Sequence, residues 1–350
     1  MSSQKKQKTI VYGAFKAMGD LLNAAPVIAS QLNAGHRVKL LLFPNPALEE
    51  FSHLIDFGSN HENLEVVHLP VSGHFSDFQK FFSRMRRIQP DLVWISPHAP
   101  GPSSSWKIPL LLWFTKKLFW RETTTLAGAE SERLSVLFDV QVRVDRNLPM
   151  MEREWVAFSM LGNGRATAFH AVTFVEAIGK CREEQPKYDL LIHPGANAPN
   201  RTWPYDRFGA VVCMIPEKYR VAVLGLPQEL ELMRTALPPD RGIQFLTGTL
   251  QEAISAIARA RVVLAMDSGA AHFAQVLHVP TVALFGKSDP QTIISREGSV
   301  MPIYERKFPC QPCGRAVCSQ PEVYCMNTIT AETVANALRR QLEPKAGERR

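Results

Sequence analysis

The sequence lacks the glycine-rich signatures that mark the commonest nucleotide-binding folds. Its first strand-to-helix loop reads Ala14-Phe-Lys-Ala-Met-Gly-Asp20, which fits neither G-x-G-x-x-G nor G-x-x-x-x-G-K. Those spacings let a tight turn bring backbone N–H groups against phosphates. Their absence argues against a Rossmann oxidoreductase and against a P-loop nucleotide hydrolase. The sequence also has no Asp-x-Asp pair that would hold Mg²⁺ on a diphosphate.

Long apolar runs and a signal peptide are missing as well. No run approaches the roughly 18 apolar residues of a membrane-spanning helix. The segment Ile10-Val-Tyr12, after a basic start, is too short for the apolar part of a secretory signal. We therefore expect a cytoplasmic protein. In that compartment the six cysteines are expected as reduced thiols or metal ligands and not as disulfides.

The composition is that of a globular protein with a basic balance. Hydrophobic residues make up 45% of the 350 residues and charged residues 21%, which argues against a disordered chain. The length allows two ordinary domains. The net charge of +7 favours anionic partners, such as a nucleotide, a phosphorylated substrate or an acidic membrane surface. No aromatic-and-basic nucleic-acid module is visible, so we expect no nucleic-acid partner.

Predicted strands and helices alternate in both halves of the chain, which indicates βαβ units and parallel sheets. The first half is expected to contain strands at 9–15, 37–43, 64–69 and 92–96 and helices at 21–33, 47–57 and 77–88. The second half is expected to contain strands at 189–193, 219–226, 243–246, 261–266 and 281–286 and helices at 205–215, 229–236 and 250–259.

The predicted fold class is α/β, with two Rossmann-like, doubly wound domains that face an interdomain cleft. The charged, proline-containing run 180–188 is the predicted linker. An N-terminal domain is expected at 1–180 and a C-terminal domain at 187–330. Residues 331–350 are expected to form a terminal helix and tail.

The most informative stretch is Asp267-Ser-Gly-Ala-Ala-His272, which lies between two predicted buried strands. Ligands of open α/β sheets bind at the carboxyl ends of the strands. A helix that starts there offers unpaired N–H groups and a positive dipole end to a phosphate. An acid, a small turn and a histidine at this place predict a site for a phosphorylated ligand.

Four other loops follow predicted strands, and most have a structural alternative. Asp20 is predicted either as a general base or as a cap of its own helix. Arg201 is either a phosphate ligand or a surface arginine. Glu229 either accepts hydrogen bonds from a ribose or places a favourable charge in a first helical turn. The run Gly248-Thr249-Leu250 is expected to flank a base.

Together these marks resemble glycosyltransferase family 9, the ADP-heptose:lipopolysaccharide heptosyltransferases. The matching segments cover nearly the whole chain in the family's order. They are Met18-Gly-Asp20, His193-Pro-Gly195 with Arg201-Thr-Trp-Pro204, Gly225 with Glu229, Asp267–His272 followed by Leu284-Phe-Gly286, and a tail ending in Cys325-Met-Asn-Thr-Ile329.

The resemblance implies a GT-B fold, an inverting transfer of a sugar and specific roles for residues. Asp20 is implied as the catalytic base of the reaction. The implied donor-binding residues are Arg201 for the phosphate and sugar, Glu229 for the ribose, Asp267 for hydroxyls of the donor sugar, and Ser268, Gly269 and His272 for the diphosphate.

The expected function is transfer of a heptose or related sugar, with ADP-heptose as the expected donor, to a lipopolysaccharide-core or other glycan acceptor. No cofactor is required for catalysis in this expectation. Arg201 stands where lysine is common and Ser268 where threonine is common, which leaves the donor sugar open. One alternative is the same fold with another nucleotide sugar or a protein acceptor. Another is a non-catalytic nucleotide-binding or assembly protein.

Four cysteines, Cys310, Cys313, Cys318 and Cys325, lie within 16 residues. Closely spaced thiolates suit a tetrahedral zinc or iron site. The spacing is not that of a standard zinc ribbon. A structural metal and free thiols are therefore both open.

The run 105–121 combines tryptophan, apolar and basic side chains. It is predicted either as an interfacial helix that contacts a membrane or as a buried amphipathic helix. In the resembling family the acceptor is a lipid-linked, phosphorylated glycan at the inner membrane face, so peripheral membrane contact belongs to the first domain. Arg84, Arg86 and Arg87 either meet acceptor phosphates or form a solvated face.

Overall fold

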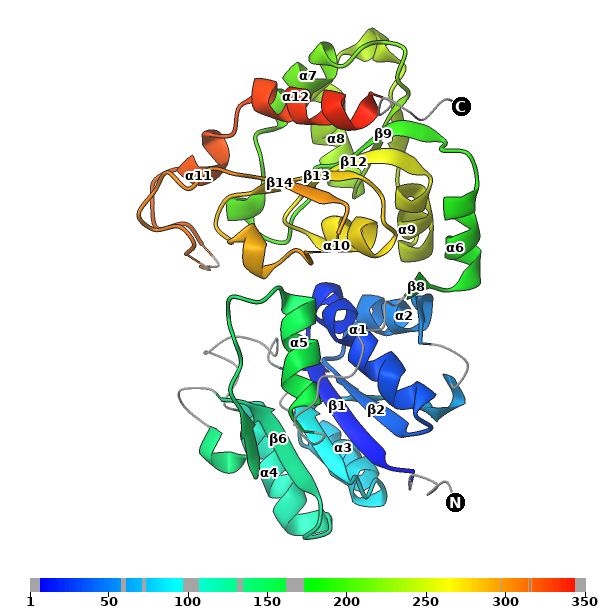
Figure 1. Cartoon of the computed structure of the whole chain (residues 1–350), viewed down its shortest axis with the longest axis vertical. Helices are drawn as coiled ribbons and strands as arrows, with labels where there is room; N and C mark the ends of the chain where they lie inside the picture. The colour runs from blue at the N-terminus through cyan, green and yellow to red at the C-terminus, as the bar shows by residue number, and fades with distance from the viewer. Residues whose placement is uncertain are drawn as a thin grey trace. The chain divides into compact units, whose positions relative to one another are not determined.

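The computed structural model describes residues 7–57, 61–70, 74–96, 107–130, 135–161, 173–296, 298–313, 315 and 317–343. The chain divides into two compact units, Met1–Thr173 and Phe174–Arg350, which we call unit 1 and unit 2. Each unit contains its own parallel sheet flanked by helices (Figure 1). The fold class is α/β with two Rossmann-like units, as the alternation of strands and helices predicted.

Unit 1 is built on a six-stranded sheet with the order β4-β2-β1-β5-β6-β7, in which all neighbours are parallel. The sheet's apolar strands are covered on both faces, so Val11 and Val93 are fully buried. Its strands are β1 (Thr9–Phe15), β2 (Arg37–Leu42), β4 (Leu64–His68), β5 (Leu92–Ile95), β6 (Thr125–Ala129) and β7 (Val140–Val142). Two short strands, β3 (Ile55–Asp56) and β8 (Thr173–Phe174), lie outside this sheet.

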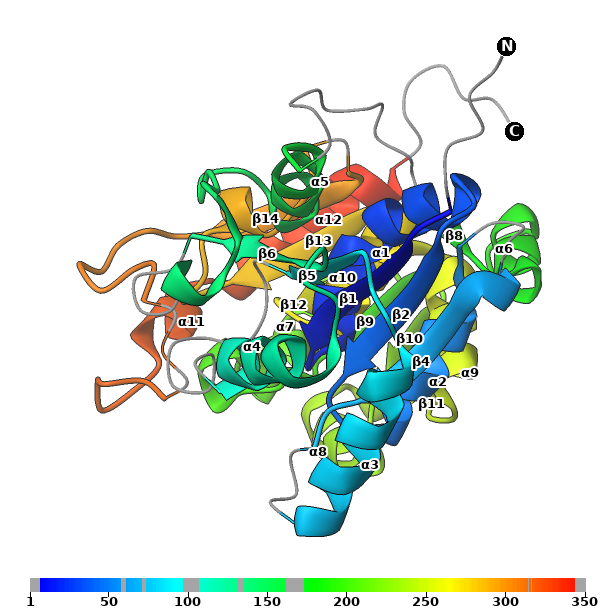
Figure 2. The same ribbon diagram turned by 90° about the horizontal axis from the view of Figure 1, so that it is seen from below.

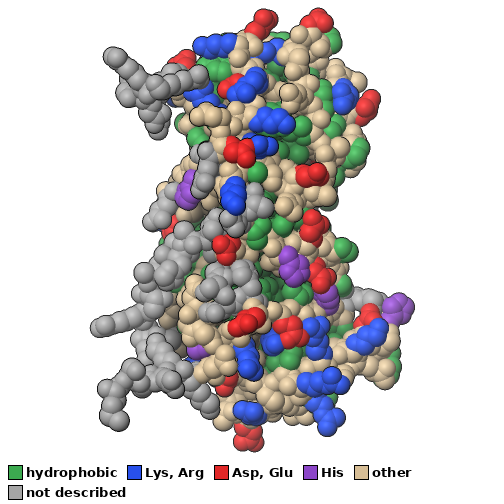
Figure 3. Space-filling model, turned by 90° about the vertical axis from the view of Figure 1, so that its right-hand side faces the viewer, with side chains coloured by type: hydrophobic (Ala, Val, Ile, Leu, Met, Phe, Trp, Pro, Cys, Tyr) green, Lys and Arg blue, Asp and Glu red, His purple; other side chains and the backbone are tan. Residues whose placement is uncertain are grey.

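Four helices of unit 1 pack in two pairs. Helix α1 packs against α5, and α3 packs against α4 (Figure 2). Trp120, which follows α4, donates its indole N–H to the carbonyl of Met85 on α3 at 2.9 Å. Lys, Arg, Asp and Glu side chains crowd the surface of this unit (lower part of Figure 3). The helices are α1 (Met18–Asn33), α2 (Pro46–Leu54), α3 (Phe75–Arg87), α4 (Lys107–Phe119) and α5 (Met150–Ser159).

Unit 2 repeats this plan with a parallel six-stranded sheet in the order β11-β10-β9-β12-β13-β14. The strands are β9 (Tyr188–His193), β10 (Val221–Leu224), β11 (Gln244–Leu246), β12 (Ala260–Met266), β13 (Thr281–Phe285) and β14 (Val300–Tyr304). The helices are α6 (Glu176–Glu183), α7 (Tyr205–Met214), α8 (Pro227–Ala236), α9 (Leu250–Ala258), α10 (Gly269–Val276), α11 (Tyr324–Asn327) and α12 (Ala331–Leu342). Both six-stranded sheets therefore have the 3-2-1-4-5-6 order of a Rossmann fold.

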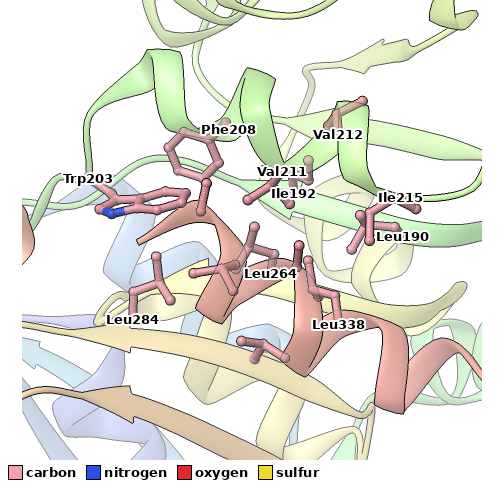
Figure 4. Close-up of a cluster of buried hydrophobic side chains, with 14 of the residues drawn as sticks. Leu190, Ile192, Trp203, Phe208, Val211, Val212, Ile215, Leu264, Leu284 and Leu338 are labelled. Carbon is pink, nitrogen blue, oxygen red and sulfur yellow. The ribbon is translucent and has the colours of Figure 1, made fainter. Parts of the chain in front are cut away.

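The core of unit 2 brings its sheet together with α7 and α12. Trp203, Phe208, Leu264 and Leu338 are fully buried in this cluster (Figure 4). Helix α12 is also fixed by polar contacts, because the guanidinium of Arg339 donates to the carbonyl that ends α7. The terminal helix expected after residue 330 thus packs as part of unit 2.

The predicted strands and helices are all present, with ends that differ by a few residues. The sequence reasoning missed β6, β7, α5 and β14. The run 180–188, predicted as a linker, holds the end of α6 and the start of β9 and lies in unit 2. The run includes the end of α6, a helix that packs against α9 and exposes Lys180. Within the described ranges, no helix has the length and hydropathy needed to cross a bilayer.

Candidate functional site

The strand order of unit 2 reverses between β9 and β12. From β9, strands β10 and β11 continue on one side, whereas β12, β13 and β14 lie on the other. A doubly wound sheet binds its ligand at the carboxyl ends of the strands that flank this reversal. The register pairs His193 at the end of β9 with Ala265 near the end of β12. The predicted loops 193–204 and 267–272 therefore leave the sheet side by side.

Asp267 and Arg201 come together at this place. Arg201 ends a 3₁₀ helix, Pro199–Arg201, in the first loop, and Asp267 directly follows β12. Arg201 Nε lies 3.3 Å from Asp267 Oδ2, and Arg201 Nη1 donates to the Asp267 carbonyl at 3.4 Å. The Asp267 side chain is 6% exposed and that of Arg201 30%. The pair thus joins a buried acid to a cation that also reaches the surface.

Helix α10 begins immediately after Asp267. Ser268 is its N-cap residue and Gly269 its first residue, and the Ser268 side chain makes no capping hydrogen bond. Burial lowers the pKa of His272, and Arg201 adds to this, while Asp267 opposes it. His272 is therefore neutral near pH 7. All four predicted residues of this motif surround one helix start beside Arg201.

Several polar atoms around this pair are buried and have no hydrogen-bond partner among the described residues. Buried polar groups of proteins are paired in the great majority of cases. A group of such atoms on the loops after β9 and β12 therefore points to a polar ligand. The atoms are His193 Nδ1, Asn200 Oδ1 and Ser268 Oγ, and they lie with the ion pair of Arg201 Nε and Asp267 Oδ2, whose atoms face each other at 3.3 Å without a hydrogen bond.

Glu229 follows β10, the strand next to β9. Its Oε2 accepts a hydrogen bond from the N–H of Leu226 at 2.8 Å, so it covers the start of α8. A Cβ at Gly195 would lie 2.4 Å from Glu229 Oε1, and one at Gly225 would lie 2.9 Å from Oε2. The two glycines let this carboxylate reach the loop after β9. The structural role predicted for Glu229 is confirmed, and its contact with a ribose stays a prediction.

The run Gly248-Thr249-Leu250 follows β11, the outermost strand of the sheet. Thr249 Oγ1 accepts from the N–H of Glu252 at 3.2 Å, and Glu252 Oε2 accepts from the N–H of Thr249 at 2.8 Å. This reciprocal pair is a capping box at the start of α9. Strands lie about 4.8 Å apart, so this run is three strands away from Asp267. Its contact with a base stays a prediction.

Lys287 is a charged residue of this region that sequence reasoning missed. It lies two residues after the end of β13, is 6% exposed and donates through Nζ to the carbonyl of Arg315 at 2.6 Å. Burial and the neighbouring Arg201 lower the pKa of Lys287, and Asp267 opposes this shift. The available signal was a lysine at the carboxyl end of a predicted buried strand, directly after the segment Leu284-Phe-Gly286.

In unit 1 the corresponding reversal lies between β1 and β5. Asp20 is the third residue of α1 and is half-buried. The N-cap position belongs to Ala17, so Asp20 is not the N-cap that its structural alternative predicted. An acid in the first turn still interacts favourably with the helix dipole. Asp20 thus lies just beyond the carboxyl end of β1, at the ligand edge of the sheet in unit 1.

The carboxyl end of β1 contains a bulge. The register of β1 with β2 shifts between Gly13 and Phe15, and φ is +120° at Gly13 and +92° at Ala14. Ala14 is fully buried. A positive φ at a non-glycine residue costs about 1–3 kcal/mol and persists only where the surrounding packing fixes it. Bulges often redirect a strand beside a functional site, and this one directs the loop that leads to Asp20.

A buried carboxylate lies between these strands and α5. Glu154 is 0% exposed and accepts hydrogen bonds from Tyr12 Oη, from Trp94 Nε1 at 2.8 Å and from Ser96 Oγ at 2.7 Å. Burial raises the pKa of Glu154 although these bonds oppose the shift. Burial and the nearby Glu154 also raise the pKa of Tyr12. Sequence reasoning missed Glu154, because its partners are 58 to 142 residues away along the chain.

The four cysteines do not assemble a metal site in this structure. All of them carry free thiols. No group of three or more His, Cys, Asp or Glu side chains is arranged to hold a metal in the described part of the chain, which includes all four cysteines. Burial raises the pKa of Cys325, and the neighbouring thiols Cys318 and Cys313 raise it further. Metal binding at the four cysteines stays a prediction.

The run 105–121 forms α4 from Lys107 onward, and residues 105–106 lie outside the described residues. Ile108 and Leu112 are buried in the core of unit 1, as the amphipathic alternative predicted. Phe114 and Leu118 are 47% and 65% exposed. Helix α4 therefore also has an apolar outer face, and its contact with a membrane stays a prediction.

Comparison with known proteins agrees with this architecture. Lipooligosaccharide heptosyltransferase 2 of Haemophilus influenzae is 34% identical over 108 residues, which are 28% of this chain and 31% of that protein. The chain thus matches about a third of the length of this relative. The structure of E. coli ADP-heptose lps heptosyltransferase II is 17% identical, with a TM-score of 0.65 over 96% of this chain and 98% of that chain. E. coli heptosyltransferase WaaC with ADP-2-deoxy-2-fluoro heptose is 13% identical, with a TM-score of 0.69 over 95% and 99%.

The two Rossmann-like units and these superpositions define the GT-B fold. The sequence profile of glycosyltransferase family 9 (heptosyltransferase) matches residues 104–324, more than half of the chain. The protein belongs to glycosyltransferase family 9.

Proposed function

We propose that this protein is an inverting glycosyltransferase that moves a sugar from a nucleoside-diphosphate sugar to a hydroxyl of a glycan. The observation that carries the proposal is the Asp267–Arg201 pair at the strand reversal of unit 2, among buried polar atoms without a described partner. A carboxylate accepts hydrogen bonds from sugar hydroxyls, and a guanidinium binds phosphate oxygens. A nucleotide sugar requires both kinds of group close together.

Asp20 is the proposed base of the reaction. Its carboxylate takes the proton from the acceptor hydroxyl. The acceptor oxygen then forms a bond to the anomeric carbon on the face opposite the diphosphate, through an oxocarbenium-like state. The bond from the anomeric carbon to the phosphate oxygen breaks, and its electron pair leaves with the nucleoside diphosphate. Attack from the opposite face inverts the configuration.

The leaving diphosphate gains negative charge during this step. Arg201 and the N-terminal end of α10 are proposed to stabilise that charge, because cations and helix N-termini attract phosphate. The neutral ring of His272 can donate one hydrogen bond to the same group. The protein itself thus offers positive charge to the leaving group, which supports catalysis without a metal.

The proposed donor is ADP-heptose. The matched sequence relative is a lipooligosaccharide heptosyltransferase, and one superimposed structure contains ADP-2-deoxy-2-fluoro heptose. Glu229 is proposed to bind the ribose, and Gly248-Thr249-Leu250 to flank the base. A calorimetric screen of ADP-, GDP-, UDP- and dTDP-sugars tests this choice. Tighter binding of a non-ADP sugar would overturn the donor assignment.

The proposed acceptor is a phosphorylated glycan of the lipopolysaccharide core at the cytoplasmic face of the inner membrane. The net charge of +7 and the exposed Phe114 and Leu118 of α4 support contact with an anionic, lipid-linked acceptor. Co-sedimentation with anionic liposomes tests the membrane contact. Lys117 Nζ lies 5.9 Å from the ring centroid of Trp113 in a cation–π contact. We expect replacement of these two residues to reduce binding to the liposomes.

Replacement of Asp20 separates catalysis from donor binding. We expect Asp20→Ala to lower the transfer rate by about 10²–10⁴-fold, the usual contribution of a positioned base. Donor affinity, measured by calorimetry, is expected to stay within about twofold, because the proposed donor residues lie in unit 2. An equal loss of transfer rate and of donor affinity would contradict the assignment of Asp20 as the base.

A structural zinc or iron at the four cysteines is a separate proposal, and no catalytic step depends on it. It rests on the close spacing of the thiols in the sequence. Cys313, Cys318 and Cys325 lie near enough to one another for the first two thiols to raise the pKa of the third. Metal analysis of the purified protein tests it, with about one equivalent expected. A metal content of less than about a tenth of an equivalent would show that the cysteines are free thiols.

A further inference from the structure

A second concave surface lies in unit 1, at the opposite edge of the sheet from Asp20. Thr9 and Arg37 begin β1 and β2, and Arg121 precedes β6, so the surface is formed at the amino ends of the strands. It encloses about 990 Å³. A strand rises about 3.3 Å per residue, so β1 places this surface roughly 20 Å from the edge that carries Asp20. We call it the amino-edge groove.

The amino-edge groove is strongly basic. Among the described residues that line it, the only acid is Glu65, which pairs with Lys39 and accepts a hydrogen bond from Arg84 at 2.6 Å. Partial burial opposes ionisation of Glu65, but these two cations outweigh it and lower its pKa. Glu65 therefore stays ionised and neutralises one charge. The cationic side chains of the groove are Arg37, Lys39, Lys80, Arg84, Arg87 and Arg121.

Four of these cations have no acidic partner in the described part of the chain. Arg37, Lys80, Arg87 and Arg121 are exposed and form no ion pair with a described residue. They come from β2, α3 and the segment after α4, so only the fold brings them together. Like charges in a concave surface create a positive potential that attracts anions.

The chemistry of the groove favours phosphate in particular. Three of the four unpaired cations are arginines, whose planar fork binds two phosphate oxygens at once. Ser83 and Gln79 also line the groove and add exposed, uncharged hydrogen-bonding groups. The volume is that of pockets that hold small molecules, which range over about 300–1,000 Å³. A bilayer is flat and fits such a concavity poorly.

We propose that the amino-edge groove binds a soluble ligand that carries two or more phosphate groups, independently of the donor site in unit 2. Several arginines engage several phosphates, and the polar side chains between them meet the remaining oxygens. Because the edge with Asp20 lies roughly 20 Å away, the ligand is bound in the groove and is not transformed there.

The probe for this site is inorganic tripolyphosphate, titrated by calorimetry into the full-length protein at low ionic strength. The groove variant is Arg87→Gln with Arg121→Gln. The matched control is Arg86→Gln with Arg143→Gln, which removes the same charge from exposed arginines of unit 1 outside the groove. We expect the dissociation constant to rise at least about tenfold in the groove variant and to stay within about twofold in the control. Circular dichroism checks that both variants are folded.

Three results would overturn the proposal. Equal weakening in both variants would show non-specific attraction by net charge. Competition between ADP and tripolyphosphate would place the probe in the donor site. Loss of binding to phosphatidylglycerol vesicles, with tripolyphosphate binding intact, would assign the groove to a membrane. If ADP does not bind at all, the proposed function is contradicted. The comparison of the groove variant with its control still tests the amino-edge groove in that case.

Discussion

The carboxylate of Asp267 is almost fully buried, and Arg201 approaches it at 3.3 Å without making a hydrogen bond to it. Replacement by alanine removes an acceptor for sugar hydroxyls and leaves the guanidinium without its acid. We expect Asp267→Ala to weaken donor binding by about ten- to a hundredfold, roughly 1.4–2.8 kcal/mol. Calorimetric titration with the nucleotide sugar measures this change.

The matched control for this measurement is Asp189→Ala. Asp189 pairs with Arg220 at 3.0 Å near the amino end of β9, away from the ligand edge of the same sheet. Its loss should leave donor affinity within about twofold, because distant sites act independently. Equal effects of the two substitutions, or no effect of Asp267→Ala, would deny Asp267 a direct role in binding.

Glu154 gathers three buried hydrogen-bond donors, so its removal leaves Tyr12, Trp94 and Ser96 without this acceptor. We expect Glu154→Ala to lower the free energy of unfolding by roughly 3–5 kcal/mol. Glu154→Gln should cost much less, because the amide oxygen still accepts and the hydroxyl of Ser96 can accept from the amide nitrogen. Urea denaturation of the two variants measures the difference, and equal losses would contradict the network.

The raised pKa of Glu154 also predicts a dependence of stability on pH. The unfolded carboxyl loses its proton near pH 4.5, whereas the folded one keeps it to higher pH. The folded state then binds more protons than the unfolded state, so stability falls as pH rises through this window. Above the folded pKa the loss is complete. We expect the wild type to lose stability relative to Glu154→Gln from about pH 4.5 upward, in denaturation curves measured from pH 4 to pH 8.

Helix α9 shows an element whose start is fixed by local chemistry alone. Thr249 and Glu252 form a capping box, and the side chain of Thr249 is thereby engaged. We expect Thr249→Ala to destabilise the protein by about 1 kcal/mol and Thr249→Ser to keep most of the stability. Thermal denaturation of the two variants measures this loss, and unchanged stability of Thr249→Ala would contradict the capping role.

The strands and helices that could be predicted from the sequence have strong periodic patterns. Buried strands such as Ala260–Met266 read as continuous apolar runs with turns on both sides. The strand Thr125–Ala129 was missed because alanine and glycine, which are depleted in strands, make up most of it. The strand Val140–Val142 is three residues long and largely exposed, so it carries no apolar run. The end of α6 was placed in a linker because the run 180–188 is mainly charged and contains a proline.

At the scale of the whole molecule, the candidate donor site could be predicted because parallel strands end at one edge of a sheet. That rule brought Arg201 and Asp267 together from segments far apart in the sequence. The same rule does not predict the hydrogen bonds of Glu154. Its partners belong to two strands and the residue after one of them, and Glu154 itself lies on a helix that had not been predicted. The amino-edge groove could not be predicted from the sequence for a similar reason. Arg37, Arg87 and Arg121 are ordinary surface arginines until the fold places them around one concavity.

Each unit has its own six-stranded sheet and its own buried cluster. All proposed donor residues lie in unit 2, and the proposed base lies in unit 1. We therefore expect a fragment of residues 174–350 to fold cooperatively and to bind ADP within about tenfold of the affinity of the full chain, or ~1.4 kcal/mol. The fragment should show no transfer, because it lacks Asp20. Circular dichroism, thermal melting and calorimetry test this, and a fragment that melts cooperatively but does not bind ADP would show that donor binding requires residues of unit 1.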